Sequence, residues 1–254
     1  MKNKKKIGIL GFGEIGASLA KVYNDHKEKF EVLIKDLERD DGLDSLDVLN
    51  ICIPYTENFI EIVKNQIHES NPDLTIIHST VMPGTTNKIK SILGNNFKVV
   101  HSPIRGVHPE LYEGIKTFVK FVGAEDDMSR RAAIEHLDSL NIKTEHCDNS
   151  VTTELGKALS TTYYGVIIAF HGEMSNFCSQ VGANFEQAIT RFNETYNKGY
   201  TSLGKENLVR PVLYPPKGNP PFIGGHCVVQ NAEMISKNFS SKSIDLIMKY
   251  KRDK

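Results

Sequence analysis

Three glycines near the start of the chain are spaced to leave room for a phosphate group. Gly11, Gly13 and Gly16 form the pattern Gly-x-Gly-x-x-Gly, directly after a short apolar run at residues 7–10. Apolar residues at helical spacing follow them. In such a strand–turn–helix unit, the first glycine permits the turn, the second admits a pyrophosphate, and the third allows close packing of helix on strand. The N–H groups at the start of the helix would then bind the phosphates.

An acidic residue lies twenty positions after the last of these glycines. A second apolar run, residues 30–34, ends close to this residue, Asp36. A carboxylate at the end of the strand can accept hydrogen bonds from the adenosine ribose hydroxyls, and it repels a 2′-phosphate. The pattern therefore predicts that the chain binds NAD in preference to NADP.

Short apolar runs continue to alternate with helical patterns up to about residue 148. Strands are expected at residues 47–54, 74–78, 97–100, 117–122 and 142–146, and helices at residues 58–67 and 127–140. The alternation predicts a Rossmann-type α/β fold, a doubly wound and mainly parallel sheet with helices on both faces. Ligands bind at the carboxyl ends of strands in such sheets. The residues expected to contact the cofactor lie in the glycine turn, at the acidic position and at the strand ends: Gly11, Phe12, Gly13, Glu14, Ile15, Gly16, Asp36, Ile53, Pro54, Tyr55, Ser79 and Thr80.

The pattern changes near residue 150. From Val151 to Val181 apolar residues recur at helical spacing, which predicts one helix of about 30 residues ending at Gly182. Further helices are expected at residues 184–197, 228–238 and 243–250. We therefore expect two domains: an NAD-binding domain over residues 1–148, and an all-helical domain over residues 149–254 that is built on the long helix.

The composition is that of an ordinary soluble globular protein, with 39% hydrophobic and 24% charged residues and a net charge of zero. Zero net charge gives no reason to expect nucleic acid or an anionic membrane surface as a partner. No apolar run reaches a membrane-spanning length. The four cysteines (Cys52, Cys147, Cys178 and Cys227) lack the paired spacing of metal sites or disulfides. We expect a small-molecule substrate, no metal, and a location in the reducing cytoplasm.

Four blocks, taken in order, resemble the UDP-glucose/GDP-mannose dehydrogenase family of NAD-dependent nucleotide-sugar dehydrogenases. They are the glycine turn and residues 79–86, 154–157 and 224–227. The last block, Gly-Gly-His-Cys, is typical of the UDP-N-acetylmannosamine branch, and the similarity spans nearly the whole chain. The resemblance implies an oxidoreductase that acts on an alcohol group of a sugar-like or hydroxy-acid substrate, with its active site between the two domains.

The resemblance also implies roles for individual residues. Cys227 matches the nucleophile that captures an aldehyde, Lys157 the lysine that stabilises the oxyanion or assists deprotonation of the alcohol, and Thr80 a threonine near the nicotinamide and a catalytic water. A thiol at the start of a helix ionises readily, and a desolvated ammonium suits the lysine role. The alternatives are a buried inert cysteine, a solvated lysine and a loop-capping hydroxyl. The candidate catalytic residues are Cys227, Lys157, Thr80, Thr161 and Asn231.

The chain departs from the family where water would be activated. Ile104 replaces a glutamate and Thr161 an asparagine, while Gln230 and Asn231 replace a lysine and an aspartate. Because neither isoleucine nor asparagine can act as a base, we expect a two-electron alcohol/carbonyl interconversion and not a four-electron oxidation. The sequence ends where the family continues into a second nucleotide-binding domain, so we expect only half of a nucleotide-sugar site unless a separate chain supplies the rest.

Other interpretations stay open. A β-hydroxyacid-type dehydrogenase shares the layout and a helix lysine but needs no cysteine, and a non-catalytic NAD-binding protein would explain the missing carboxylates. His101, Arg105 and His108 follow a strand end and could bind an anion, although loop-capping roles are favoured. His171 and Glu173, two positions apart, lack metal-site spacing. The length of the long helix predicts a homodimer interface along it.

Overall fold

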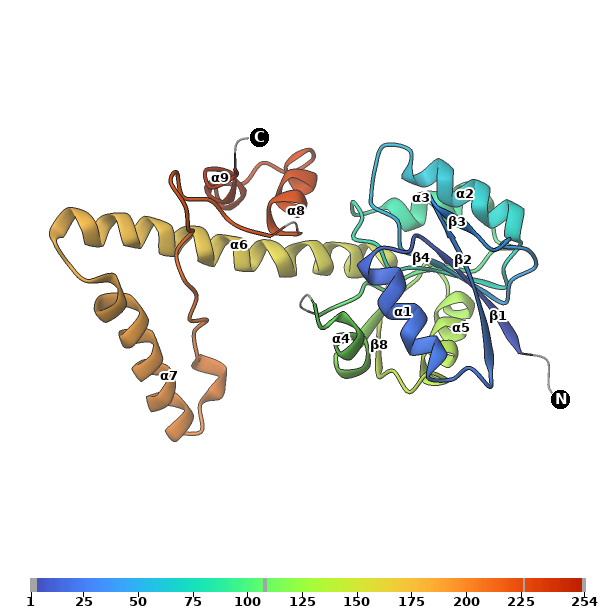
Figure 1. The fold of residues 1–254 in the computed structure, drawn as a ribbon, viewed down its shortest axis with the longest axis horizontal. Helices are drawn as coiled ribbons and strands as arrows, with labels where there is room; N and C mark the ends of the chain where they lie inside the picture. Colours follow the sequence, from blue (N-terminus) through green and yellow to red (C-terminus); the bar gives the residue numbers. More distant parts are fainter. Residues whose placement is uncertain (1–3, 107–108, 226, 253–254) are drawn as a thin grey trace. The chain divides into compact units, whose positions relative to one another are not determined.

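The chain divides into two compact units, Met1–Lys157 and Ala158–Lys254. The computed structural model describes residues 4–106, 109–225 and 227–252. The boundary between the units falls inside one long helix, α6 (Ser150–Val181), whose first turns belong to the first unit (Figure 1). The division into domains of residues 1–148 and 149–254 stays a prediction, because both units share this helix.

The first unit is built on an eight-stranded sheet with the order β3-β2-β1-β4-β5-β6-β7-β8. Neighbouring strands are parallel except for the β2–β3 and β6–β7 pairs, which are antiparallel. The predicted Rossmann-type, mainly parallel sheet is confirmed. The strands are β1 (Lys5–Leu10), β2 (Phe30–Asp36), β3 (Arg39–Asp40), β4 (Val48–Ile51), β5 (Leu74–Ile77), β6 (Val99–His101), β7 (Lys120–Gly123) and β8 (Thr144–Cys147).

Helices cover both faces of this sheet. On one face lie α1 (Glu14–Asn24), α4 (Leu111–Thr117) and α5 (Asp127–Asp138). On the other lie α2 (Phe59–Ser70) and α3 (Thr85–Leu93) (Figure 1). Each face has its own hydrophobic core, as a doubly wound fold requires.

Successive side chains of the central strands lie alternately in these two cores. In β1, Ile7 and Ile9 pack on the α1 side, whereas Leu10 packs on the α2 side. In β5, Ile76 and Ile77 divide in the same way. Because both faces are buried, the strands have the continuous apolar sequences from which they were predicted.

Several elements of the first unit differ from the expectation, among them α3, which was not predicted as a helix. The predicted strand at residues 117–122 begins only at Lys120, because Thr117 is the last residue of the unpredicted helix α4. Leu111 and Ile115, four residues apart, bury one side of α4 against the core. The edge strand β3 was also not expected.

The second unit is built of helices, as predicted. No helix in the described ranges, α6 included, has the length and apolar character needed to cross a membrane. The helix predicted to end near residue 197 continues to Ser202, after beginning as a π-helix. After α6 the chain forms this π-helix (Glu186–Arg191), α7 (Phe192–Ser202), a 3₁₀ turn (Glu206–Leu208), α8 (Cys227–Ser236) and α9 (Lys242–Met248).

Two glycines of α6 admit the following segments at close range. A Cβ atom on Gly165 would lie 2.5 Å from Cγ1 of Val228 on α8. A Cβ atom on Gly172 would lie 2.6 Å from the hydroxyl of Tyr250, just beyond α9. The buried contacts between α6, α8 and α9 form the core of the second unit. Substitution of either glycine would force these segments apart.

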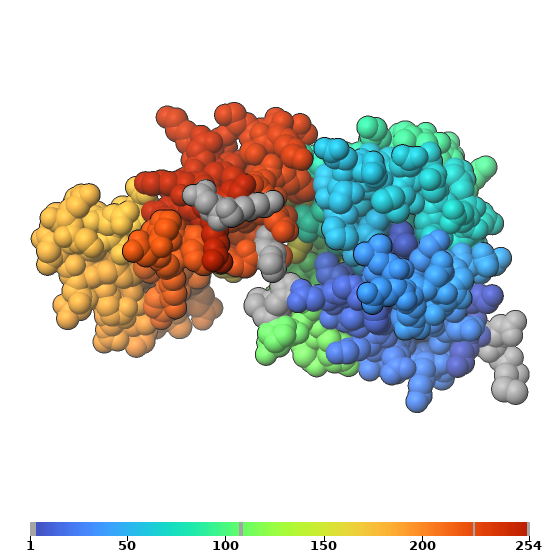
Figure 2. Space-filling model, turned by 45° about the horizontal axis from the view of Figure 1, so that its top comes forward, coloured from blue at the N-terminus to red at the C-terminus, as the bar shows by residue number. Residues whose placement is uncertain are grey.

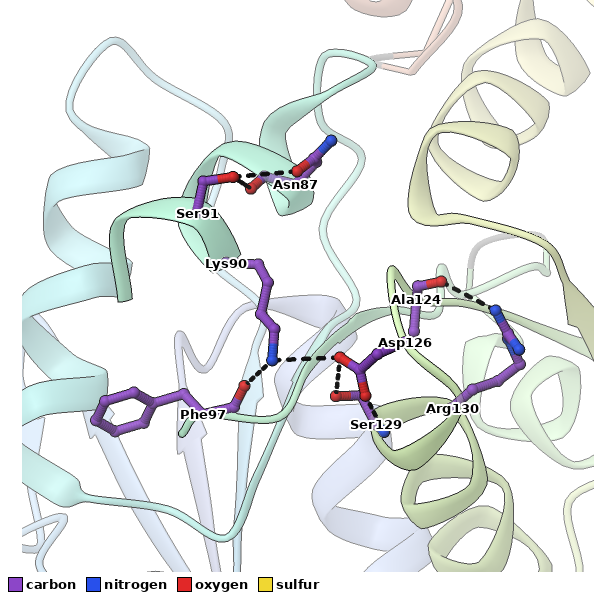
Figure 3. Close-up of polar contacts among 8 residues, drawn as sticks. All are labelled: Asn87, Lys90, Ser91, Phe97, Ala124, Asp126, Ser129 and Arg130. Atoms are coloured by element: carbon purple, nitrogen blue, oxygen red, sulfur yellow. Dashed lines mark hydrogen bonds and ion pairs between the residues drawn. The ribbon is translucent and has the colours of Figure 1, made fainter. Parts of the chain in front are cut away.

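Polar contacts tie α3 to the beginning of α5 (Figure 3). Lys90 Nζ on α3 donates to the Phe97 carbonyl oxygen at 2.5 Å and pairs with Asp126 Oδ2 at 3.2 Å. Asp126 also caps α5, because its carboxylate accepts from the Ser129 backbone N–H at 2.7 Å. The C-terminal half of α3 is therefore fixed to the turn between β7 and α5.

Buried histidines predict an acid-sensitive fold. Burial lowers the pKa of His101 to about 3 and that of His136 to about 4, from the ordinary 6.5. Between about pH 6.5 and 4 the unfolded chain therefore binds protons that the folded chain does not. The free energy of unfolding should fall there, as the pH falls, by up to about 1.4 kcal/mol per pH unit for each histidine.

Urea unfolding at pH 7.5 and pH 5, followed by circular dichroism, measures this loss. The His136→Phe variant should lose less stability than the wild type over the same interval, since one of the three buried histidines with a lowered pKa, His78, His101 and His136, no longer titrates. Equal midpoints for the wild type at both pH values would contradict the prediction.

Candidate active site

The glycine turn between β1 and α1 has the geometry of a phosphate site. A Cβ atom on Gly16 would lie 2.0 Å from the Gly11 carbonyl oxygen, and Gly11 itself has a φ of +94°. The protein's own packing therefore requires glycine at both positions. Around Gly13, by contrast, a Cβ atom would meet no described atom within 4 Å. The open space at Gly13, in front of the N–H groups of the first turn of α1, fits a pyrophosphate.

Asp36, the last residue of β2, lies beside this turn. Its carboxylate accepts hydrogen bonds from the backbone N–H groups of Phe12 and Leu37, the latter at 2.6 Å. These two donors, Phe12 first, lower the pKa of Asp36, so the side chain is charged at neutral pH. Its position next to the turn and its charge fit an acceptor for ribose hydroxyls.

The ends of β4 and β5 continue the same edge of the sheet. A Cβ atom on Gly11 would lie 2.9 Å from Ile53, which follows β4 and is therefore packed against the glycine turn. The Ser79 hydroxyl, after β5, donates to the Ile53 carbonyl oxygen at 2.6 Å. Tyr55 packs its ring on Phe59 of α2, with centroids 5.4 Å apart. The expected cofactor residues of the strand ends thus gather along one edge of the sheet.

A buried polar cluster supports the ends of β5, β6 and β7. His101 Nε2 donates to the Ser79 carbonyl oxygen at 3.1 Å, and its Nδ1 accepts from the Thr153 hydroxyl at 2.8 Å. Lys120 Nζ donates to the carbonyl oxygens of Ser102 at 2.5 Å and Pro103 at 3.2 Å. Both side chains are buried. They hold the loops that follow β5 and β6.

The sequence expectation missed Lys120. Its side chain is buried, and burial lowers its pKa to about 7. The positive charge of Lys157 on α6 contributes to the lowering for both Lys120 and His101. The Lys157 ammonium therefore lies near the ends of β6 and β7. A lysine inside the otherwise apolar run at residues 118–123 was the available signal.

Cys227, Asn231 and Thr161 come together in the second unit. Cys227 is exposed and is the first residue of α8. Asn231 lies one turn further along α8 on the same side. Its amide donates to the Thr161 hydroxyl on α6 at 2.7 Å. Two of the positions that depart from the family pattern, 161 and 231, are therefore direct partners. The approach of Cys227 to Lys157 and Thr80 stays a prediction.

Other candidates have structural contacts. Ile104 is buried in the core of the first unit, so its position supplies no base. The Arg105 guanidinium lies over the rings of Phe118 and Phe121, 5.4 and 5.5 Å from their centroids. His108, and His226 of the Gly-Gly-His-Cys block, lie outside the described residues. Within the described ranges no three His, Cys, Asp or Glu side chains are grouped to hold a metal ion.

Known proteins resemble the chain in sequence and fold. No protein-family model matches it. It is 27% identical over 199 residues to a UDP-N-acetyl-D-mannosamine dehydrogenase of Methanocaldococcus jannaschii, covering 72% of this chain and 42% of that protein. The structure of a UDP-D-ManNAc dehydrogenase from Pyrococcus horikoshii has a TM-score of 0.76 at 19% identity, over 96% of this chain and 68% of that one. A 3-hydroxyisobutyrate dehydrogenase of Mycobacterium tuberculosis has a TM-score of 0.68 at 14% identity, over 97% of this chain and 92% of that one.

These comparisons confirm the resemblance to nucleotide-sugar dehydrogenases that the four sequence blocks predicted. The chain spans less than half the length of the curated relatives it matches. The structural neighbours support the Rossmann-type fold of the first unit.

The contrast between two glycines gives a direct test of the phosphate site. Gly13→Val should keep the fold, since the added atoms enter open space, but should weaken NADH binding by about tenfold or more. Gly16→Ala should instead destabilise the protein by about 1–3 kcal/mol, because its Cβ atom overlaps the Gly11 carbonyl. Thermal melts and NADH fluorescence titrations measure the two effects. Unchanged NADH affinity in Gly13→Val would argue against a cofactor at this turn.

Proposed function

We propose that the protein is an NAD-dependent oxidoreductase acting on an alcohol group of a sugar-like or hydroxy-acid substrate. The observation that carries this proposal is the glycine turn, open at Gly13 and flanked by the charged Asp36. This arrangement suits a dinucleotide whose pyrophosphate binds the start of α1. Because Asp36 is ionised, it repels a 2′-phosphate, and the proposed cofactor is NAD and not NADP.

The proposed reaction removes two electrons from the substrate. Bound NAD would supply the hydride acceptor. The hydroxyl proton passes to water as the carbonyl forms. Lys157 stabilises the developing negative charge on the oxygen, and Thr80 orients the substrate or a water. The Cys227 thiol can add across the carbonyl, its sulfur bonding to the carbon and its proton passing to the oxygen, which gives a thiohemiacetal.

The side chains at positions 104 and 231 support a reaction that stops at the carbonyl. Ile104 is buried and apolar, and the Asn231 amide is engaged by the Thr161 hydroxyl. Neither can activate a water for hydrolysis of a thioester. We propose that Thr161 and Asn231 position the substrate instead. The names of the relatives suggest an N-acetylated nucleotide sugar as one substrate to try.

We further propose a homodimer formed through α6. Large apolar side chains recur on this helix at spacings of four and seven residues and are about half exposed. α7 has no buried residue, and its segment, yellow to orange in Figure 2, lies at the surface. A second copy of the chain would cover these side chains. They are Leu159, Tyr163, Phe170, Phe177 and Val181 of α6 and Phe192 of α7.

The four cysteines are free thiols in the structure, which suits the proposed reducing cytoplasm.

Stoichiometry and two substitutions test the catalytic proposal. With UDP-N-acetylmannosamine or 3-hydroxyisobutyrate as trial substrates, we expect one NADH per substrate consumed. Lys157→Met should lower kcat by about a hundredfold or more, because the oxyanion loses its counter-charge. Cys227→Ser should abolish activity only if the thiol captures the carbonyl; retained activity would favour the β-hydroxyacid-type reaction.

Two NADH per substrate would contradict the two-electron reaction. NADH binding without turnover of any alcohol, in the presence of candidate partner chains, would favour a non-catalytic NAD-binding protein.

The dimer is tested by charge placed on the exposed face of α6. Phe170→Asp with Phe177→Asp should convert a dimer into a monomer, because burying the carboxylates in an apolar interface is costly. Phe239→Asp, at a side chain that is equally exposed outside α6, is the matched control and should leave the dimer intact. Light scattering coupled to size exclusion gives the masses. A wild-type monomer at micromolar concentration would overturn this part of the proposal.

A further inference from the structure

A buried carboxylate joins α6 to the segment that follows β5. Glu154, in the first turns of α6, is 0% exposed. Its Oε2 accepts from the Gly84 backbone N–H at 2.6 Å. Its Oε1 accepts from the Thr86 backbone N–H at 2.8 Å and from the Thr86 hydroxyl at 2.6 Å. Glu154 therefore caps the start of α3 from another helix.

Beginning a helix with a buried carboxylate from another helix costs free energy. Ser, Thr, Asn and Asp are the preferred local caps of helices, and Asp126 and Ser241 cap α5 and α9 in this way. The N-cap residue of α3 is Gly84, which has a φ of +94° and no side chain to offer. Burial raises the pKa of Glu154, which means that desolvation of the carboxylate costs free energy. Besides beginning α3, this remote and buried cap joins the start of α3 to α6.

The cap fixes one end of a loop whose other end is also anchored. At the first end, Ser79 donates its hydroxyl to the Ile53 carbonyl and accepts from His101 at its own carbonyl. At the second end, Gly84 donates to Glu154. Thr80, proposed to contact the substrate or a water, lies between these two anchors. α3 beyond the loop is held in turn by Lys90 and its partners (Figure 3).

Strand order identifies which half of a bound dinucleotide this loop would meet. The pyrophosphate site follows β1, and the ribose acceptor Asp36 follows β2 on one side of it. A dinucleotide across the sheet edge must therefore place its other half over β4 and β5, on the opposite side. The loop after β5 lies on the nicotinamide side.

We propose that Glu154 is a positioning residue for the nicotinamide half of the cofactor site. The inference rests on the proposed NAD binding. Glu154 holds the Thr80 loop against α6, and Lys157 lies three residues further along that helix. One carboxylate thus sets the distance between the loop that carries Thr80 and the helical turn that carries Lys157. Loss of the cap should misplace the nicotinamide half and leave the adenosine half undisturbed.

Two ligands separate this role from a general effect on stability. NADH spans the whole site, whereas ADP-ribose lacks the nicotinamide. In Glu154→Gln an amide N–H₂ replaces one acceptor oxygen and opposes a donor. We expect the Kd for NADH to rise by about tenfold and that for ADP-ribose to change by less than about twofold. Isothermal titration calorimetry on the full chain measures both constants.

Glu125→Gln is the matched control. The Glu125 carboxylate also caps a helix, accepting from the Ser150 hydroxyl at 2.5 Å at the start of α6. Its hydrogen bonds among the described residues go to Ser150 and not to the loop after β5. This variant should leave both constants unchanged. Thr86→Val and Thr86→Ser cover the possibility that Glu154→Gln fails to fold. The valine variant should weaken NADH selectively, and the serine variant should bind as the wild type does.

The possible results separate a failure of the positioning role from a failure of the proposed NAD binding. Selective loss of NADH affinity in Glu154→Gln or Thr86→Val supports the positioning role. Equal losses of affinity for both ligands, or no loss for either, overturn the positioning role. They do not overturn the proposal that the wild-type chain binds NAD. A wild-type chain that binds neither ligand overturns the proposed function and the inference together.

Discussion

The close approach of α1 to the end of β1 is the constraint on which the site depends. A Cβ atom on Gly16 would lie 2.0 Å from the Gly11 carbonyl oxygen, so the contact is possible only between glycines. It directs the N–H groups at the start of α1 toward the sheet edge, beside Asp36 and Ile53. The open space at Gly13 then has a phosphate-binding helix end on one side and a ribose acceptor close by.

Buried polar groups around that edge give the site its order at a cost in stability. His101, Lys120 and Glu154 are all buried. Burial lowers the pKa of His101 and Lys120 and raises that of Glu154, so in each case it favours the neutral form. Each is satisfied by hydrogen bonds to the loops after β5 and β6. A lysine with a pKa near 7 also limits the repulsion that a second ammonium, that of Lys157, would experience. The loops are thereby held in place before any ligand binds, as an oriented active site requires.

The sequence predicted the elements that depend on residues close together in the chain. The glycine turn, the strands and the long helix follow from spacing and apolar runs within a few residues, and the structure contains them. α4 was missed because its short amphipathic pattern is stabilised by packing of Leu111 and Ile115 on a distant core. The Glu154 cap and the Asn231–Thr161 hydrogen bond join residues 68 to 70 positions apart, which no periodicity signals. The sequence indicated Thr161 and Asn231 as candidate catalytic residues at positions that depart from the family pattern, but it did not predict the hydrogen bond between them.

The central claim is that the Cys227 thiol and the Lys157 ammonium converge on a dinucleotide held by the glycine turn. A crystal structure of the full chain with NADH tests it most directly. The account predicts the pyrophosphate at the start of α1, and Cys227 Sγ and Lys157 Nζ both within about 5 Å of the space above the nicotinamide C4 atom, where a reacting carbon would sit. Density for NADH with either side chain more than about 10 Å from that space would contradict the account, because that side chain could then not act on the substrate.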